Sequence, residues 1–234
     1  MRTVFFFVQS ATIVIVTIFY SIAVITFMAF TDRRVFYPFA RNWSRLLLAI
    51  CGVRVKSEGL ELYTDGTAHV YVCNHSSLFD IPILLATLPS GAAIMYKREL
   101  EKIPIFGWCL RLSPFIAVTR EDPRNAMVSI EQAAEAVRNG GSALIFPEGT
   151  RSADGSLGEF RRGAVAVALR AGKPIAPLAI IGANRILPKK SLYFHAGTVI
   201  LRAAPPIEIP DTIDRTAEKE FVRNLHSIIA TMMA

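Results

Sequence analysis

The sequence predicts an α/β fold in which helices flank a central, mostly buried β-sheet, with further helices at the N-terminus that anchor the protein to a membrane. Two observations lead to this prediction. Apolar β-like runs alternate with helical segments along most of the chain, and a long uncharged segment precedes them. The 234 residues suit one domain, residues 56–234, and an N-terminal appendage, residues 1–55.

The uncharged segment at 4–30 predicts a membrane helix. No charged residue occurs between Val4 and Phe30. As an α-helix this run is about 40 Å long, against about 30 Å for the hydrocarbon core of a bilayer. The run is too long for the core of a signal peptide, and no small-residue cleavage site follows it. We therefore expect a retained membrane helix, with a buried or re-entrant hairpin as the alternative.

The next segment, 36–51, predicts an amphipathic helix. Its apolar residues recur at steps of three and four, and Arg41 and Arg45 fall on the opposite face. Such a helix can lie at a membrane interface, and the alternative is a core helix docked on the domain. The apolar positions are Phe36, Phe39, Ala40, Trp43, Leu47 and Ile50.

The net charge of +7 favours anionic lipid as a partner rather than nucleic acid. Arg33, Arg34, Arg41 and Arg45 follow the apolar run, and only Arg2 precedes it. This bias predicts that the domain at 56–234 faces the cytoplasm. The chain shows no basic stripe interleaved with aromatic residues, which is typical of single-stranded nucleic-acid binders.

The segments after the second helix alternate between strand and helix patterns. Helix periodicity marks 124–141, 160–172 and the tail from Thr216, and Gly140 and Gly172 are expected to end the first two. The predicted strands are 68–74, 92–97, 115–120, 142–149, 173–180 and 198–203.

The stretch "VCNHSSLFDIP" places His75 five residues before Asp80. On one ideal helix these side chains would point about 140° apart, so they meet only if His75 lies in a turn before the helix. Ser76 or Ser77 could then cap the helix, and the carboxylate could hold the imidazole in the tautomer whose free nitrogen accepts a proton. The alternative is a capped helix with a core histidine. Because no nucleophile elbow accompanies the pair, a base here would activate a hydroxyl brought by the substrate.

The stretch "FPEGTRS", 146–152, is a candidate anion-binding turn. Gly149 permits a positive φ, Thr150 offers a hydroxyl, and Arg151 offers a planar fork suited to phosphate. Lys97 and Arg120 end two predicted strands and could contribute cations at the same edge of the sheet. Taken alone, the stretch at 146–152 is equally well explained as an ordinary polar turn, and Lys97 and Arg120 as surface charges.

The sequence implies no metal and no bound cofactor. The histidines and cysteines lack zinc-ligand spacing, and neither a phosphate-loop lysine motif nor a dinucleotide glycine fingerprint occurs. The odd and irregular set of Cys51, Cys73 and Cys109 predicts buried, reduced thiols.

Four segments, taken in order, resemble the glycerolipid acyltransferase family, and most closely its lysophosphatidic acid (1-acylglycerol-3-phosphate) acyltransferases. They are "NHSSLFD", "KRELEKIPIFGW" followed by "FIAVTR", "FPEGTRS", and "IAPLAI". The second segment departs from the family pattern at Pro114 and Thr119, which puts the role of Arg120 in doubt. The resemblance implies that the domain at 56–234 is an acyltransferase domain.

The same resemblance implies roles for particular residues. His75 would be the general base and Asp80 its orienting partner. The remaining residues would bind the acceptor phosphate or shape the loop that does so: Lys97, Arg120, Glu148, Gly149, Thr150 and Arg151.

The implied reaction moves a fatty acyl group from acyl-CoA or acyl-ACP (acyl carrier protein) to the free hydroxyl of lysophosphatidic acid, giving phosphatidic acid. The thioester is a co-substrate, and membrane phospholipids surround the anchor. Alternative acceptors are glycerol-3-phosphate, another lysophospholipid and a lyso-aminolipid. The alternative without catalysis is a membrane-tethered lipid-binding protein.

Overall fold

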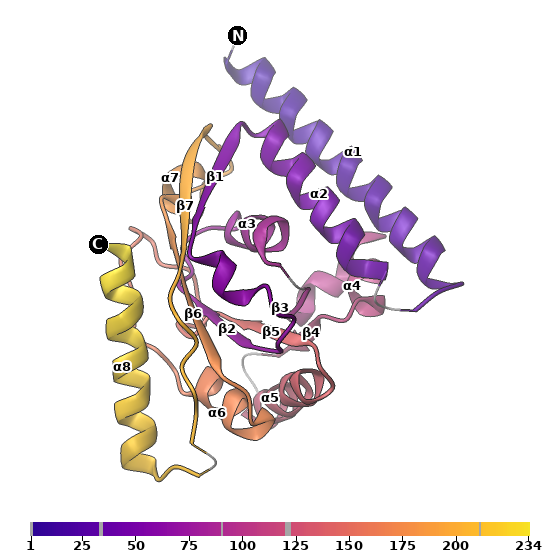
Figure 1. Ribbon diagram of the computed structural model, residues 1–234. Coiled ribbons are helices and arrows are strands. Elements are labelled where there is room, and N and C mark those ends of the chain that lie inside the picture. The colour runs from indigo at the N-terminus through magenta and orange to yellow at the C-terminus, as the bar shows by residue number, and fades with distance from the viewer. Residues whose placement is uncertain (1, 33–34, 90, 120–122, 211) are drawn as a thin grey trace.

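The computed structural model describes residues 2–32, 35–89, 91–119, 123–210 and 212–234 (Figure 1). The helices are α1 (Arg2–Met28), α2 (Phe36–Ile50), α3 (Asp80–Thr87), α4 (Phe106–Leu112), α5 (Pro123–Arg138), α6 (Gly163–Ala171), α7 (Ala183–Ile186) and α8 (Arg215–Met233), with 3₁₀ turns η2 (Leu60–Tyr63) and η3 (Arg98–Lys102). The strands are β1 (Val53–Glu58), β2 (Val70–Cys73), β3 (Ala92–Lys97), β4 (Ile116–Val118), β5 (Ser142–Ile145), β6 (Ile175–Ile181) and β7 (Gly197–Ala203).

Within the described residues the strands form a seven-stranded sheet in the order β1-β7-β6-β2-β5-β3-β4. Neighbouring strands run parallel except β6 and β7, which are antiparallel. The predicted α/β class is confirmed. Because β2, β5 and β3 are parallel neighbours, their carboxyl ends lie along one edge of the sheet, where loops can gather side chains into a site.

Helices cover both faces of the sheet, and the side chains of β2 show how. Val70 and Val72 point into a core shared with α5, α6 and α8, whereas Tyr71 and Cys73 point into a core shared with α2 and α3. All four residues are 0% exposed, which explains why this strand reads as a continuous apolar run. In Figure 1, α5, α6 and α8 lie on the side of the sheet away from α1 and α2.

The N-terminal helix α1 runs alongside α2 (Figure 1). Contacts join the two helices near the beginning, middle and end of α1: Gln9 Nε2 donates to Ile50 O (2.9 Å), Trp43 Nε1 donates to Thr17 Oγ1 (3.1 Å), and the ring centroids of Phe27 and Phe39 are 5.2 Å apart. The helix is therefore attached to the rest of the protein along its length.

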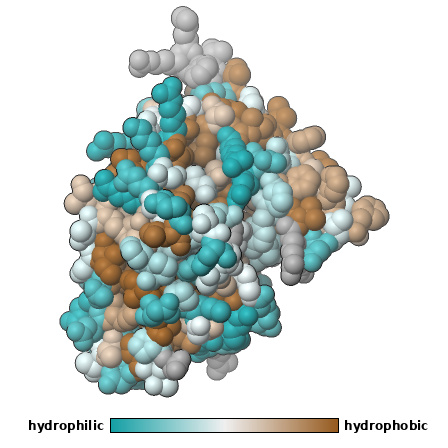
Figure 2. Space-filling view, in the orientation of Figure 1, coloured by the Kyte–Doolittle hydropathy of each residue, from teal (hydrophilic) through white to brown (hydrophobic). Residues whose placement is uncertain are grey.

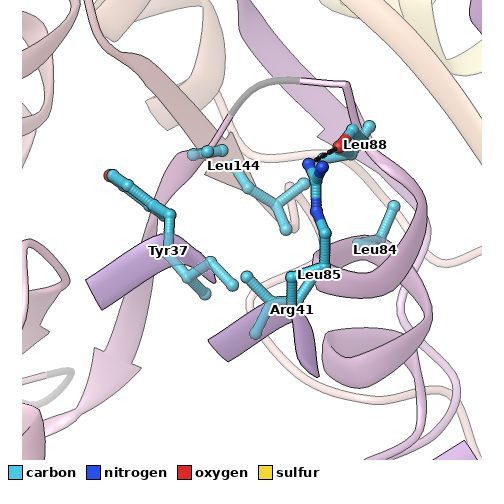
Figure 3. Close-up of a pocket in the computed structure, with 9 residues that line it drawn as sticks. Tyr37, Arg41, Leu84, Leu85, Leu88 and Leu144 are labelled. Carbon is cyan, nitrogen blue, oxygen red and sulfur yellow. Dashed lines mark hydrogen bonds between the residues drawn. The ribbon is translucent and has the colours of Figure 1, made fainter. Parts of the chain in front are cut away.

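The apolar face of α2 packs against α3 and is part of the core. Arg41 and Arg45 were predicted to share the polar face, and Arg45 is exposed, but Arg41 is half-buried and bound within the protein. Its guanidinium bonds the carbonyl oxygens of Leu88 and Pro89, just beyond the end of α3 (Figure 3). The structure thus shows α2 docked on the domain, with Arg41 binding carbonyl groups of the segment that directly follows α3.

Candidate active site

The turn after β2 carries the predicted acid–base pair. His75 lies between the end of β2 at Cys73 and the start of α3 at Asp80. Its Nδ1 is 2.7 Å from Asp80 Oδ2, so the hydrogen bond that the spacing permits is confirmed. A carboxylate oxygen can only accept here, which places the proton on Nδ1 and leaves Nε2 with a free lone pair.

Asp80 is fixed by donors that converge on one of its oxygens. The side chain is 0% exposed, and Oδ2 also accepts from the backbone N–H groups of Ser76 (2.7 Å) and Ser77 (2.8 Å). Among the residues that the structure describes, the other oxygen, Oδ1, is buried without a partner. Because three donors converge on Oδ2, the carboxylate is held in one orientation against Nδ1 of the imidazole.

The predicted capping of the helix by Ser76 or Ser77 is wrong. The residue preceding α3 is Phe79, and no side chain caps the helix there. The Ser77 hydroxyl instead donates to Leu187 O (2.9 Å) and accepts from the N–H of Phe79 (3.2 Å). The serines therefore hold the turn through Asp80 and the segment after α7.

The imidazole of His75 stacks on Phe146, with ring centroids 4.0 Å apart and planes inclined by 18°. Phe146 follows β5 and begins the "FPEGTRS" stretch. The His75 side chain remains 12% exposed. Stacking on one side and Asp80 on another therefore hold the ring in place while solvent or a ligand can still reach it.

Cys73 lies two residues before His75 but cannot act as a nucleophile at neutral pH. Burial raises the pKa of its thiol well above the usual range, and the nearby charges of Asp80 and Glu148 raise the pKa further. All three cysteines are buried and free, as predicted. Within the described part of the chain, no three His, Cys, Asp or Glu side chains gather as metal ligands would.

Glu148 links three segments around the histidine. Its buried carboxylate accepts from the backbone N–H of His75 through Oε1 (2.6 Å) and from that of Gly158 through Oε2 (2.9 Å). Both oxygens are therefore occupied by the protein's own backbone. Next to it, Gly149 has a φ of 70°, and a Cβ added there would lie 3.4 Å from the Arg161 guanidinium.

A groove of about 440 Å³ opens beside this loop. Its lining includes Thr150, Arg151, Ser152, Asp154, Phe160 and Arg161. Hydrogen bonds from Ser156, side chain first and then backbone, lower the pKa of Asp154 to about 2, so this carboxylate stays ionised. Two guanidinium groups with neighbouring hydroxyls suit a phosphate, and the sequence analysis did not single out Arg161.

The predicted anion-binding residues are only partly brought together. Ser152 N donates to His75 O (2.8 Å), so the loop carrying Arg151 is bonded directly to the turn carrying the histidine. Lys97 ends β3 with its ammonium exposed and 3.3 Å from Glu99, and it does not line the groove. Arg120 lies outside the described residues.

Comparison with known proteins identifies the family of this domain. Residues 54–181 match the family model described as Acyltransferase. The chloroplastic 1-acyl-sn-glycerol-3-phosphate acyltransferase BAT2 of Brassica napus is 35% identical over 161 residues, which are 68% of this chain and 46% of that protein. The 1-acyl-sn-glycerol-3-phosphate acyltransferase of Pseudomonas aeruginosa is 33% identical over 170 residues, covering 70% and 65% of the two chains. The match spans a little less than half the length of BAT2 and of the chloroplastic relative LPAT1 of Arabidopsis thaliana.

The fold also resembles a solved structure. The crystal structure of the 1-acyl-sn-glycerophosphate acyltransferase PlsC from Thermotoga maritima superposes with a TM-score of 0.82 and 24% sequence identity. The superposition covers 99% of this chain and 92% of that chain. The similarity therefore extends over the N-terminal helices as well as the sheet.

Proposed function

The chain belongs to the acyltransferase family, and we propose that it transfers a fatty acyl group to the free hydroxyl of lysophosphatidic acid, giving phosphatidic acid. The observation that carries the proposal is the His75–Asp80 hydrogen bond, which uses Nδ1 and not Nε2, in a turn joined through Ser152 to the loop that carries Arg151. The names of the relatives, which are acyltransferases acting on 1-acyl-sn-glycerol-3-phosphate, support a phosphate-bearing acceptor.

In the proposed reaction His75 acts as a general base. Nε2 takes the proton of the acceptor hydroxyl as its oxygen attacks the thioester carbonyl carbon, and Asp80 stabilises the resulting imidazolium. The tetrahedral intermediate collapses, the carbon–sulfur bond breaks, and the imidazolium returns the proton to the leaving thiolate. Neither neighbouring candidate is available as a nucleophile for an acyl-enzyme, because the Cys73 thiol is buried and protonated and the Ser77 hydroxyl is bonded to Leu187. The proposed transfer is therefore a direct attack by the acceptor hydroxyl.

The acceptor phosphate is proposed to bind in the groove beside the histidine. Arg151 and Arg161 supply charge there, Thr150 supplies a hydroxyl, and Gly149 adopts the positive φ of the turn between them. Glu148 shapes the loop, since its oxygens are used by backbone donors. Lys97 and Arg120 stay predictions. The donor is a fatty acyl thioester of coenzyme A or of acyl carrier protein, with no further cofactor.

The length and exposed apolar surface of α1 support the proposed membrane association. Among the described residues, Phe6–Met28 is a helix long and apolar enough to cross a membrane, with a mean hydropathy of 2.3 and only 11% of its apolar window buried. Figure 2 shows hydrophobic residues gathered at the upper right, where α1 lies. The most exposed large side chains along α1 include Phe7, Ile15 and Phe19, each about two thirds exposed.

The packing of α1 favours a helix lying along the membrane. A helix perpendicular to the bilayer would carry α2, to which it is bonded from Gln9 to Phe27, into the hydrocarbon together with the exposed Arg45. We therefore propose that α1 is immersed along its length in one leaflet. We propose that this is the cytoplasmic leaflet, whose anionic lipids would attract the basic residues that follow the apolar run. The acceptor would then reach the groove from the bilayer and the donor from the cytosol.

The experiment is a thiol-release assay on the purified protein with vesicles, an acyl-CoA and a panel of acceptors. Lysophosphatidic acid should be preferred over glycerol-3-phosphate, a lysophospholipid with a larger head group and a lyso-aminolipid. His75→Ala should lower turnover by at least the roughly 10²- to 10⁴-fold that general-base catalysis contributes. The matched control is His195→Ala, which removes an exposed histidine. Near-normal turnover in folded His75→Ala protein would exclude the mechanism.

A further inference from the structure

We propose that Lys189 is a positioning residue that locks the Arg151 loop to the turn carrying His75; this inference rests on the proposed function of that site. Lys189 is partly buried in the segment after α7, and its ammonium donates to the carbonyl oxygen of Arg151. The N–H of Ser152 donates to the carbonyl oxygen of His75 (2.8 Å). Neither Lys189 nor its segment belongs to the groups assigned to catalysis above.

These two hydrogen bonds belong to one peptide unit. The carbonyl of Arg151 and the N–H of Ser152 are the two polar groups of the same planar amide. Lys189 therefore holds one end of this amide while the backbone of His75 holds the other. An ionised donor makes a stronger hydrogen bond than a neutral one, and it polarises the amide so that the bond on the far side is strengthened too.

Other contacts from the same segment brace the same two loops. The Ser77 hydroxyl, in the histidine turn, donates to Leu187 O (2.9 Å). Asn184 Nδ2 donates to Asp154 O (3.0 Å) on the far side of the groove loop. Residues 184–189 thus contact both the turn carrying His75 and the Arg151 loop. Of the three hydrogen bonds described, only that of Lys189 has a charged donor. Losing that charge should loosen the loop and the turn together.

The kinetic consequence is a combined effect on binding and rate. In Lys189→Met we expect kcat/KM for lysophosphatidic acid to fall about 10- to 100-fold, in line with the loss of a hydrogen bond to a charged group. Both the acceptor KM and kcat should change, because Arg151 and His75 are displaced together, whereas the KM for the thioester should not. Lys189→Arg keeps an ionised donor and should recover most of the activity. The matched control is Lys190→Met, which removes the exposed neighbouring ammonium and should behave like the wild type.

A double-mutant cycle separates positioning from direct phosphate binding. If Lys189 acts through the Arg151 loop, the Lys189→Met change should raise the acceptor KM by less than about 3-fold in an Arg151→Ala background. If the ammonium binds the phosphate independently, the two effects should multiply, and that result would overturn the proposal.

Hydrogen exchange in the substrate-free protein provides a readout that does not depend on acyl transfer. In Lys189→Met the backbone amides of peptides covering 72–80 and 146–156 should exchange at least about 10-fold faster, while Lys190→Met should match the wild type. Lys189→Gln, which keeps a neutral donor, replaces Lys189→Met should the latter fail to fold. Unchanged exchange in both segments refutes the inference about Lys189. A wild-type protein that releases no thiol with any acceptor refutes the proposed function instead.

Discussion

Replacing Asp80 tests two separate roles of this carboxylate: its charge is expected to serve catalysis, and its hydrogen bonds are expected to stabilise the fold. Oδ2 accepts from His75 Nδ1 and from the backbone of Ser76 and Ser77, while Oδ1 has no partner among the described residues. In Asp80→Asn the amide oxygen should take the place of Oδ2, because the reverse orientation would set an NH₂ group against three donors. The histidine should therefore keep its orientation and tautomer, and the change should remove only the charge.

The magnitude follows from that separation. Two unit charges about 4 Å apart attract by about 4 kcal/mol at an effective dielectric constant of about 20, so losing the carboxylate charge beside the imidazolium should cost roughly 10³-fold in kcat. The free energy of unfolding should change little. In Asp80→Ala the two backbone donors lose their acceptor at about 1–3 kcal/mol each, so that stability should fall by about 2–6 kcal/mol, with activity lost as well.

The assay combines thiol release with urea unfolding for the wild type, Asp80→Asn and Asp80→Ala. An Asn variant that is as destabilised as the Ala variant would show that the amide does not replace Oδ2. An Asn variant with activity within tenfold of the wild type would show that the charge is not used to stabilise the imidazolium. Either result would refute the reasoning from the hydrogen-bond pattern.

Three further predictions concern the groove, the buried thiols and the membrane. Arg151→Ala should raise the acceptor KM by about 10- to 150-fold, leaving the thioester KM unchanged; a rise in the thioester KM alone would assign Arg151 to the donor site. Burial raises the pKa values of Cys51 and Cys109 from 9.0 to about 11 in the folded protein. The stability that these neutral thiols contribute is therefore complete below pH 9 and is lost as the pH rises to about 11. Thermal melts should show Tm falling between pH 9 and pH 11, and falling less steeply in a Cys51→Ala/Cys109→Ala protein. Ile15→Ser/Phe19→Ser, at exposed positions of α1, should weaken flotation with vesicles without lowering Tm, and unchanged flotation would show that this face does not enter the membrane.

The parts of the fold that could be predicted from sequence are those with strong local patterns. The strand at 92–97 has the bounds that its apolar run predicts, and α5 and α6 end before glycines that adopt the left-handed conformation. Strand β1 was not predicted. In its sequence, "VRVKSE", four of the six residues are charged or polar, and it becomes a strand by pairing with β7 far along the chain.

The residues of the site also differ in whether sequence alone could predict their positions. The His75–Asp80 bond could be predicted because both residues belong to one short turn, in which spacing limits the geometry. Arg161 and Lys189 could not, since their positions depend on packing between distant segments; Lys189 is 38 residues from the carbonyl it binds. Helical periodicity likewise placed Arg41 on the polar face beside Arg45, because the periodicity contains no information about the carbonyls of Leu88 and Pro89.

The position of β2 between β5 and β6 also determines when the site can exist during synthesis. Asn74, beside the histidine, exchanges two hydrogen bonds with the backbone of Ile180, 106 residues later. At about 5–20 residues per second, a ribosome needs about 5–20 s to add that length. The apolar α1 leaves the ribosome well before then, so the nascent chain can reach the bilayer while its histidine turn still lacks both neighbouring strands. If α1 associates with the membrane as proposed, the candidate catalytic centre would complete its folding late, at the membrane surface.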